Sequence, residues 1–136
     1  MAEFIMKDLV KKAGAEHEFY IESAGTSNEE EGNPVYPPVK KLLSHYNITC
    51  GGKTARKMTR ADYDRFDLII AMDYSNLRGI DRITGGDRDN KIHLLLSYAG
   101  EQRAISDPWY TRNFEAARQD ILLGCTALLN TLTRSE

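Results

Sequence analysis

Two short apolar segments, residues 68–72 and 92–96, constrain the fold of this chain more than any other feature. Residues 68–72 are uninterrupted leucine, isoleucine, alanine and methionine, which is typical of a β-strand that is buried on both faces. A helical pattern at about residues 75–83 separates the two segments. Buried strands that alternate with helices predict a parallel sheet with helices on both sides. We therefore expect an α/β fold, a three-layer sandwich around a parallel sheet.

Helix signals lie on both sides of these segments. Apolar residues recur at helical spacing over residues 1–13, and Gly14 stands where a helix ends. The proline pair at 37–38 and the T-x-x-D pattern at 59–62 each favour a helix start. The further helices that we expect are residues 37–45, 59–65 and 116–132.

Residues 18–23 form a β-prone run that ends in a turn of small residues at 23–27. We predict a strand here. An α/β domain of this pattern normally begins with a strand, whereas the first element predicted in this chain is a helix. We therefore expect that a strand upstream of Met1 is missing from the chain as printed.

Composition narrows the class of protein. A length of 136 residues with 41% hydrophobic content fits one domain, residues 1–136. The net charge of -2 arises from 18 basic and 20 acidic residues spread along the chain, which argues against a nucleic-acid partner. No apolar run approaches the roughly 20 residues of a membrane span. Cys50 and Cys125 are too few for a disulfide scaffold, so we expect reduced thiols and a cytoplasmic location.

A loop with the sequence Asp107-Pro108-Trp109-Tyr110 precedes the last predicted helix. A carboxylate next to two aromatic side chains suits a general acid beside an aromatic binding wall. The alternative is an Asp-Pro turn whose aromatic rings pack into the core, and the four residues alone favour that alternative.

Cys50 and Arg56 have the C-x5-R spacing of a loop that wraps phosphate around a thiolate. The segment before Cys50 is too short for a firm strand, and no hydroxyl residue follows Arg56 to open a helix. We therefore interpret this match as fortuitous. The three histidines are scattered without partners at metal-ligand spacing, so no metal or other cofactor is expected. Cys125 lies on the apolar face of the last helix and is predicted to be inert.

Several segments taken in order resemble the low-molecular-weight protein tyrosine phosphatase family, and the likeness covers essentially the whole chain. They are residues 1–4 (MAEF), 23–27 (SAGTS), 32–35 (GNPV), 55–59 (ARKMT), 71–73 (AMD) and 106–110 (SDPWY). In that family a C-x5-R-S-P loop leads straight into the first helix. The resemblance implies that this chain starts just after that proline, and that it lacks the first strand and the nucleophile loop.

The resemblance implies a mechanism in which a cysteine thiolate attacks phosphorus of a phosphotyrosine protein, without a cofactor. Asp107 matches the general acid, Trp109 and Tyr110 match the aromatic wall, and Ser23 matches the serine that supports the nucleophile loop. Lys53 stands where many members have a histidine. Because the nucleophile and the phosphate-binding arginine would lie upstream of Met1, the printed chain is predicted to be inactive.

Two other classes of function compete with this interpretation. A non-catalytic module could keep the scaffold and bind phosphotyrosine peptides or a partner, and an arsenate reductase shares the fold but needs resolving cysteines. The resemblance also places the absent strand between residues 18–23 and 68–72. We expect these strands either to close on one another or to pair with a second chain, giving a homodimer.

Overall fold

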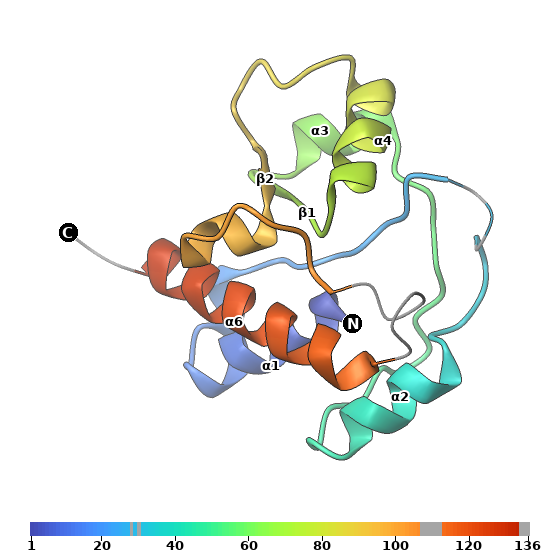
Figure 1. Ribbon diagram of the computed structural model, residues 1–136, viewed down its shortest axis with the longest axis vertical. Coiled ribbons are helices and arrows are strands. Elements are labelled where there is room, and N and C mark those ends of the chain that lie inside the picture. The colour runs from blue at the N-terminus through green and yellow to red at the C-terminus, as the bar shows by residue number, and fades with distance from the viewer. Residues whose placement is uncertain (28, 30, 107–112, 134–136) are drawn as a thin grey trace.

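The computed structural model describes the whole chain except residues 28, 30, 107–112 and 134–136. Figure 1 shows the elements in their arrangement. The helices are α1 (Ala2–Lys12), α2 (Pro37–Ser44), α3 (Arg60–Arg65), α4 (Tyr74–Thr84) and α6 (Phe114–Thr133), with 3₁₀ turns η1 (Glu16–Glu18) and η2 (Leu95–Ala99). The strands are β1 (Ile69–Ala71) and β2 (Ile92–Leu94). All the predicted helices are present, and their ends agree with the predictions to within two residues.

The two strands form a parallel sheet in which Ile70 pairs with His93. Helices α3 and α4 lie on one side of this sheet, and α1 and α6 lie on the other (Figure 1). The expected α/β architecture with a parallel sheet is therefore confirmed. Among the described residues, no helix is long and apolar enough to cross a membrane.

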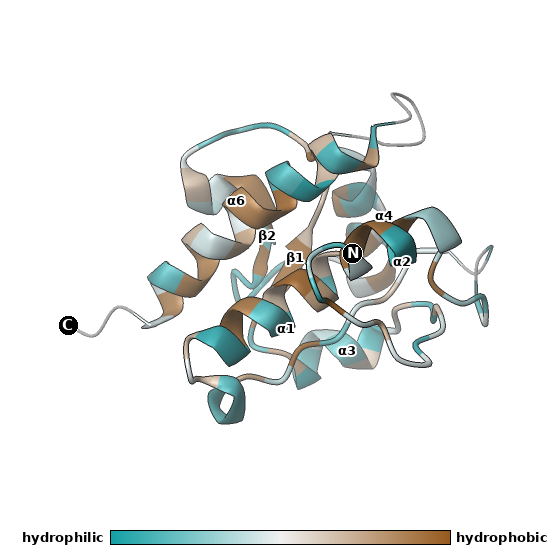
Figure 2. Ribbon diagram, turned by 90° about the horizontal axis from the view of Figure 1, so that it is seen from below, coloured by the Kyte–Doolittle hydropathy of each residue, from teal (hydrophilic) through white to brown (hydrophobic). Residues whose placement is uncertain are grey.

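Each side of the sheet has its own hydrophobic cluster. The larger cluster joins α1, α2, η2 and α6, and Leu68, Ile70 and Met72 pack against it. The smaller cluster joins the strands to α4, and its buried members are Met58, Ala71, Ile80 and Leu94. Figure 2 shows brown apolar residues on both strands and on the side of α6 that faces them. The alternation of side chains along β1 produces this division, because successive residues of a strand point to opposite faces.

Local signals account for where the helices begin and end. Thr59 and Asp62 form the capping box of α3. Asp73 caps α4 by accepting a hydrogen bond of 2.7 Å from the backbone N–H of Asn76. Gly14, just beyond α1, has a positive φ of 72°, a conformation that costs glycine little.

Two strand predictions need correction. Residues 18–23 are not a strand, because no backbone hydrogen bond pairs them with another described segment. The segment is linked to the rest of the fold at its end, where Gly25 forms an isolated bridge to Lys57. Strand β2 ends at Leu94, and the chain then coils into η2, where Ser97 Oγ donates a hydrogen bond of 2.6 Å to Leu94 O.

β1 is also less buried than predicted. Only Ala71 is fully buried, while Ile69 and Ile70 are half-buried. The apolar run therefore marks the strand correctly but overstates how completely the rest of the structure covers it.

Candidate functional site

The loop that carries Asp107 begins next to the carboxyl end of β1. The N–H of Ile105 donates a hydrogen bond of 2.9 Å to Met72 O, and the N–H of Ser106 donates one of 2.9 Å to Asp120 on α6. After the loop, the side chain of Asn113 accepts a hydrogen bond of 2.9 Å from Ala116 N–H. The described residues before and after the loop are therefore hydrogen-bonded to the end of β1 and to α6. The predicted site residues Asp107, Trp109 and Tyr110 lie outside the described residues.

Ser23, the fourth predicted site residue, belongs to a group of polar side chains at the start of α1. Its hydroxyl donates a hydrogen bond of 2.6 Å to Oε1 of Glu3. The same oxygen lies 3.0 Å from Lys53 Nζ, and Oε2 lies 2.7 Å from Lys7 Nζ. We call these four residues the Glu3 cluster. Lys53 also donates a 3.3 Å hydrogen bond to the carbonyl oxygen of Ser23. The cluster therefore binds both the hydroxyl and the backbone carbonyl of that serine.

The charge of Glu3 is stabilised although the side chain is only 3% exposed. Burial alone would raise the pKa of Glu3, but hydrogen bonds from Lys7, Ser23 and Lys53 outweigh it and lower the pKa to about 2. The carboxylate is therefore ionised at neutral pH, and its two lysine partners satisfy it.

Sequence reasoning did not single out Glu3, although a signal was available. Glu3 lies on the same helical stripe as the buried residues Met6 and Val10. A charged residue on an apolar stripe indicates a buried carboxylate that has partners elsewhere in the fold.

Close packing fixes the turn that follows Ser23. Gly25 N–H donates a hydrogen bond of 2.8 Å to Arg56 O, and Met58 N–H donates one of 2.8 Å to Gly25 O. Gly79 of α4 lies against Thr26 so closely that a Cβ on Gly79 would be 2.6 Å from Thr26 Cβ. The turn after Ser23 is thereby held between the segment that leads to α3 and the face of α4.

The Cys50 loop does not form an anion site. The guanidinium of Arg56 is bound to Asp62, with Nη1 to Oδ2 at 2.9 Å, and to Glu22, with Nε to Oε1 at 3.0 Å. The N–H of Ala55 donates to Asn33 O at 2.8 Å. The Arg56 guanidinium and the Ala55 N–H therefore already have partners within the fold. This supports the interpretation of the C-x5-R match as fortuitous.

Neither cysteine of the chain suits a nucleophile. Both thiols are buried, with 5% of Cys50 and 2% of Cys125 exposed. Burial raises the pKa of Cys50, and it raises the pKa of Cys125 to about 12. Both groups are therefore protonated thiols at neutral pH, whereas nucleophilic attack requires a thiolate.

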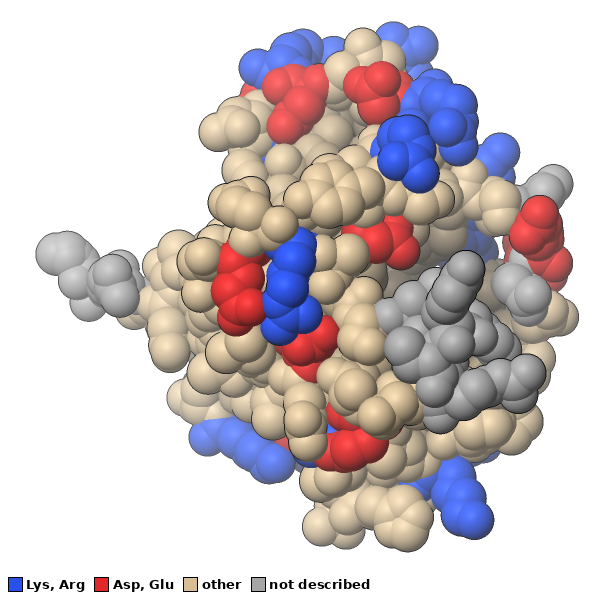
Figure 3. Space-filling model, in the orientation of Figure 1, with Lys and Arg blue, Asp and Glu red and all other residues tan. Residues whose placement is uncertain are grey.

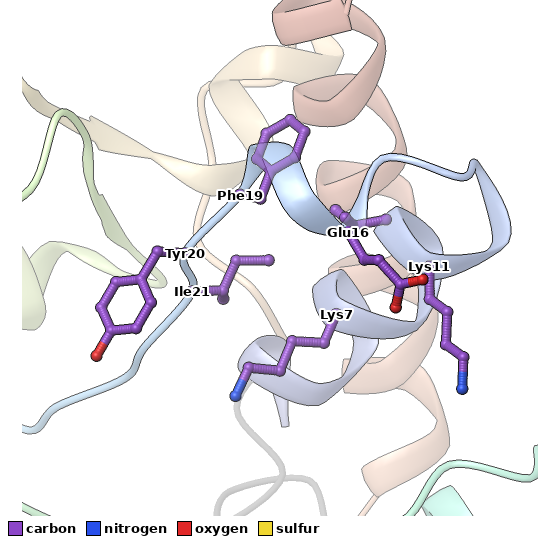
Figure 4. Close-up of a pocket in the computed structure, with 7 residues that line it drawn as sticks. Lys7, Lys11, Glu16, Phe19, Tyr20 and Ile21 are labelled. Carbon is purple, nitrogen blue, oxygen red and sulfur yellow. The ribbon is translucent and has the colours of Figure 1, made fainter.

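A groove of about 320 Å³ lies between α1 and the segment that follows it (Figure 4). Its lining residues are Lys7, Val10, Lys11, Glu16, Phe19, Tyr20 and Ile21. The lining residues include no cysteine, and the one hydroxyl among them belongs to Tyr20, which points away from α1 and donates a hydrogen bond of 2.6 Å to Glu22 Oε2. The groove therefore does not present a nucleophilic side chain for phosphoryl transfer. Over the face in Figure 3, basic and acidic side chains both occur in several places.

Comparison with known proteins decides the family. The family model for low molecular weight phosphotyrosine protein phosphatases matches residues 1–136. This chain belongs to that family. The resemblance inferred from the sequence motifs is confirmed at the level of the family.

Individual relatives of the phosphatase family agree with this assignment. The low molecular weight protein-tyrosine-phosphatase YfkJ of Bacillus subtilis is 35% identical over 138 residues, which cover 100% of this chain and 88% of that protein. PtpA of Staphylococcus aureus is 31% identical over 134 residues, 98% of this chain and 85% of its own length.

Solved structures of the family show the same fold. The crystal structure of YfkJ matches with a TM-score of 0.91, covering 96% of this chain and 84% of that chain. The structure of a Drosophila arginine phosphatase matches with a TM-score of 0.88 at 29% identity, covering 99% of this chain and 90% of that chain. The described part of this phosphatase-family chain thus has the backbone arrangement of these solved structures.

Proposed function

We propose that this chain provides the general-acid and loop-support parts of a protein tyrosine phosphatase site, within a single domain of residues 1–136. The observation that carries the proposal is the Glu3 cluster. It holds Ser23 in place at the start of α1, where the family places a serine that supports the nucleophile loop. Ile105, two residues before Asp107, is hydrogen-bonded to Met72 at the carboxyl end of β1, the edge at which open α/β sheets bind ligands.

The proposed reaction transfers a phosphoryl group through cysteine. A thiolate attacks phosphorus of phosphotyrosine, a P–S bond forms, the P–O bond to the ring breaks, and Asp107 donates its proton to the departing phenolate oxygen. The Asp107 carboxylate then takes a proton from water as that water attacks phosphorus. The P–S bond breaks, which releases inorganic phosphate and restores the thiolate. Trp109 and Tyr110 are proposed to flank the phenyl ring.

The nucleophile of this reaction is neither Cys50 nor Cys125, because both are buried and protonated. We propose that a C-x5-R-S-P loop outside these 136 residues supplies it, and that the 136 residues alone do not hydrolyse phosphate esters. The substrate class is phosphotyrosine protein, and the setting is the reducing cytoplasm.

Hydrolysis of an aryl phosphate tests the proposal. The 136-residue chain is compared with a version extended at its amino end by a β-strand and C-x5-R-S-P. We expect turnover only in the extended version. Cys50→Ser in the extended version should leave that turnover unchanged, because Cys50 takes no part in it. Activity in the unextended chain that disappears with Cys50→Ser would contradict the assignment of the nucleophile.

The role of Asp107 is tested in the extended version. Asp107→Asn should lower the rate by about 10²–10⁴, because a positioned general acid contributes on that order. Asp64→Asn is the control, since Asp64 is 72% exposed and pairs with an exposed arginine on the surface. Equal rates for Asp107→Asn and the parent would refute the assignment. Phosphoarginine is a useful second substrate, because one structural relative is named an arginine phosphatase.

A further inference from the structure

The two residues before Asp107 are both hydrogen-bonded through their backbone N–H groups. Ile105 N–H donates to Met72 O at 2.9 Å, and Ser106 N–H donates to Oδ2 of Asp120 at 2.9 Å. Ile105 is also buried in the larger cluster. In Figure 1 this stretch follows η2 and reaches the carboxyl end of β1 beside α6. The backbone that leads into Asp107 therefore has one partner at the end of the sheet and one in a helix.

The carboxylate of Asp120, in the second turn of α6, is itself oriented by an arginine. Arg103 Nη1 donates to Oδ2 and Nη2 donates to Oδ1, each at 3.0 Å. The side chain of Asp120 is 16% exposed. A guanidinium that binds both oxygens of a carboxylate fixes the plane of that group. Since Ser106 N–H donates to the same Oδ2, the orientation set by Arg103 is the one in which Asp120 binds the backbone.

The charge of Asp120 suits a supporting role and excludes a proton-donating one. Hydrogen bonds from Arg103 and from Ser106 N–H outweigh burial and hold the pKa of Asp120 below its ordinary value. The carboxylate is therefore ionised at neutral pH and has no proton to give to a leaving group. An ionised acceptor makes a stronger hydrogen bond to a backbone N–H than a neutral one does.

The packing of α6 on the rest of the fold does not depend on Asp120. The buried residues of this helix that pack in the larger cluster are Ala117, Ile121, Cys125, Leu128 and Leu129. The carboxylate of Asp120 instead binds a half-exposed arginine and the backbone N–H next to Asp107. Its contacts therefore serve the segment that carries Asp107 rather than the attachment of the helix.

We propose that Asp120 is a positioning residue for the general acid, because its carboxylate, oriented by Arg103, fixes the backbone of Ser106 immediately before Asp107. The proposal rests on the proposed function, in which Asp107 protonates the departing phenolate. Asp120 acts through one peptide group and touches neither the substrate nor the reacting atoms. A displacement of a catalytic group by about 1 Å lowers a rate by up to about 10²-fold, so the loss of this single backbone contact is expected to be measurable.

The dependence of the rate on the leaving group tests this role in the extended version of the chain. Phenyl phosphate releases a basic phenolate that needs a proton, whereas the dinitrophenolate of 2,4-dinitrophenyl phosphate leaves without one. The quantity measured is kcat/KM, which covers the steps up to release of the phenolate. We expect Asp120→Ala to lower kcat/KM for phenyl phosphate by about 10–10²-fold. For the dinitrophenyl ester we expect a change of less than about twofold.

Two further variants separate positioning from a general effect on structure. Asp120→Asn keeps an oxygen that accepts Ser106 N–H but loses the charge, so its loss on phenyl phosphate should be smaller, less than about tenfold. Gln119→Ala is the matched control, since Gln119 is the exposed neighbour of Asp120 in α6 and bonds within the helix to Glu115. This control should match the parent on both esters.

The results that would overturn the role of Asp120 are specific. Equal losses on the two esters would show a structural effect, and an Asp120→Asn variant as defective as Asp120→Ala would show that the contact with Ser106 is not the cause. If Asp120→Ala does not fold, as judged by circular dichroism, Asp120→Asn still decides, because parent-like values on both esters would also overturn the role.

Trp109 provides a measurement on the 136-residue chain that needs no catalysis. It is the one tryptophan of the sequence and lies two residues after Asp107. Quenching of its fluorescence by acrylamide reports how accessible the indole is. We expect Asp120→Ala to raise the quenching constant, and Asp120→Asn and Gln119→Ala to match the parent. An unchanged constant in a folded Asp120→Ala variant would overturn the proposal, even if the extended version showed no turnover.

The two proposals fail in different ways. If Asp107→Asn shows no selective loss on phenyl phosphate, the assignment of Asp107 as general acid is wrong. If Asp107→Asn shows that selective loss and Asp120→Ala does not, the proposed function stands and Asp120 is not a positioning residue.

Discussion

At the scale of single residues, Glu3 joins parts of the chain that are far apart in sequence. Its carboxylate binds Lys7 in the same helix, Ser23 after it, and Lys53 beyond α2. Hydrogen bonds to a buried charged group typically contribute about 1.5–3 kcal/mol each. The position of Ser23 therefore depends on the ionisation of Glu3.

Glu3→Gln tests this dependence through the pH profile of stability. The pKa of Glu3 is about 2 in the folded chain and about 4.5 for an ordinary glutamate. The folded state thus binds fewer protons, so this contribution is complete above about pH 4.5 and is lost as pH falls toward 2. At pH 7 we expect Glu3→Gln to lower the free energy of unfolding by about 1.5–3 kcal/mol, measured in urea.

At low pH, Glu3→Gln should become as stable as the parent. The stability difference from the parent is expected to shrink steadily between about pH 4.5 and pH 2. Asp8→Asn is the control, because Asp8 pairs with Lys12 across one turn on the surface, and exposed pairs contribute at most about 1 kcal/mol. A difference that stays constant across this pH range would show that Glu3 is not held ionised by the cluster.

At the scale of elements, the contact between α6 and η2 depends on Gly124. A Cβ built on Gly124 would lie 2.5 Å from Cγ of Leu95, a side chain that is 1% exposed. Leu95 cannot move away without disturbing the larger cluster, because protein cores are close-packed. The absence of a side chain at this position allows the longest helix to lie directly on the turn that follows β2.

Gly124→Ala is therefore expected to destabilise the chain by about 1–3 kcal/mol, the usual cost of overpacking a core. Helix propensity alone would give the opposite effect on stability, because it favours alanine over glycine by about 1 kcal/mol. Gly52→Ala is the matched control, since nothing lies within 4 Å of a Cβ at that position. Midpoints of thermal unfolding for the two variants check the expectation, and a Gly124→Ala variant as stable as the parent would contradict the packing argument.

At the scale of the whole molecule, the two hydrophobic clusters differ in size. The larger one draws buried residues from α1, α2, η2 and α6, whereas the smaller has only Met58, Ala71, Ile80 and Leu94. The sheet between them has only two strands among the described residues. Regions with few buried apolar contacts open at lower free energy than the rest of a domain.

We therefore expect amide hydrogens of α4 to exchange faster than those of α1 and α6. Hydrogen exchange followed by mass spectrometry on the 136-residue chain measures this order. Uniform exchange across α1, α4 and α6 would indicate one cooperative unit and contradict the division into two clusters.

Prediction from the sequence succeeded where the determinants are local. Thr59 and Asp62 form the capping box at the start of α3, and Gly14 follows the end of α1. The residues that set each of these helix ends lie within a few positions of it in the sequence. The apolar run at 68–72 contains β1, because consecutive β-branched and other apolar residues favour a strand between two layers of helices. The ordered set of short motifs was enough to identify the family, and the family model confirms it.

The tertiary structure decided the rest. Residues 18–23 have strand-like composition, but a strand also needs a neighbour for its backbone groups, and no described segment provides one. Leu95 and Leu96 belong to an apolar run yet coil into a 3₁₀ turn, because that turn places them against the larger cluster. The Glu3 cluster joins residues 3, 7, 23 and 53, and only folding sets the distances that make its carboxylate a buried, ionised support for Ser23.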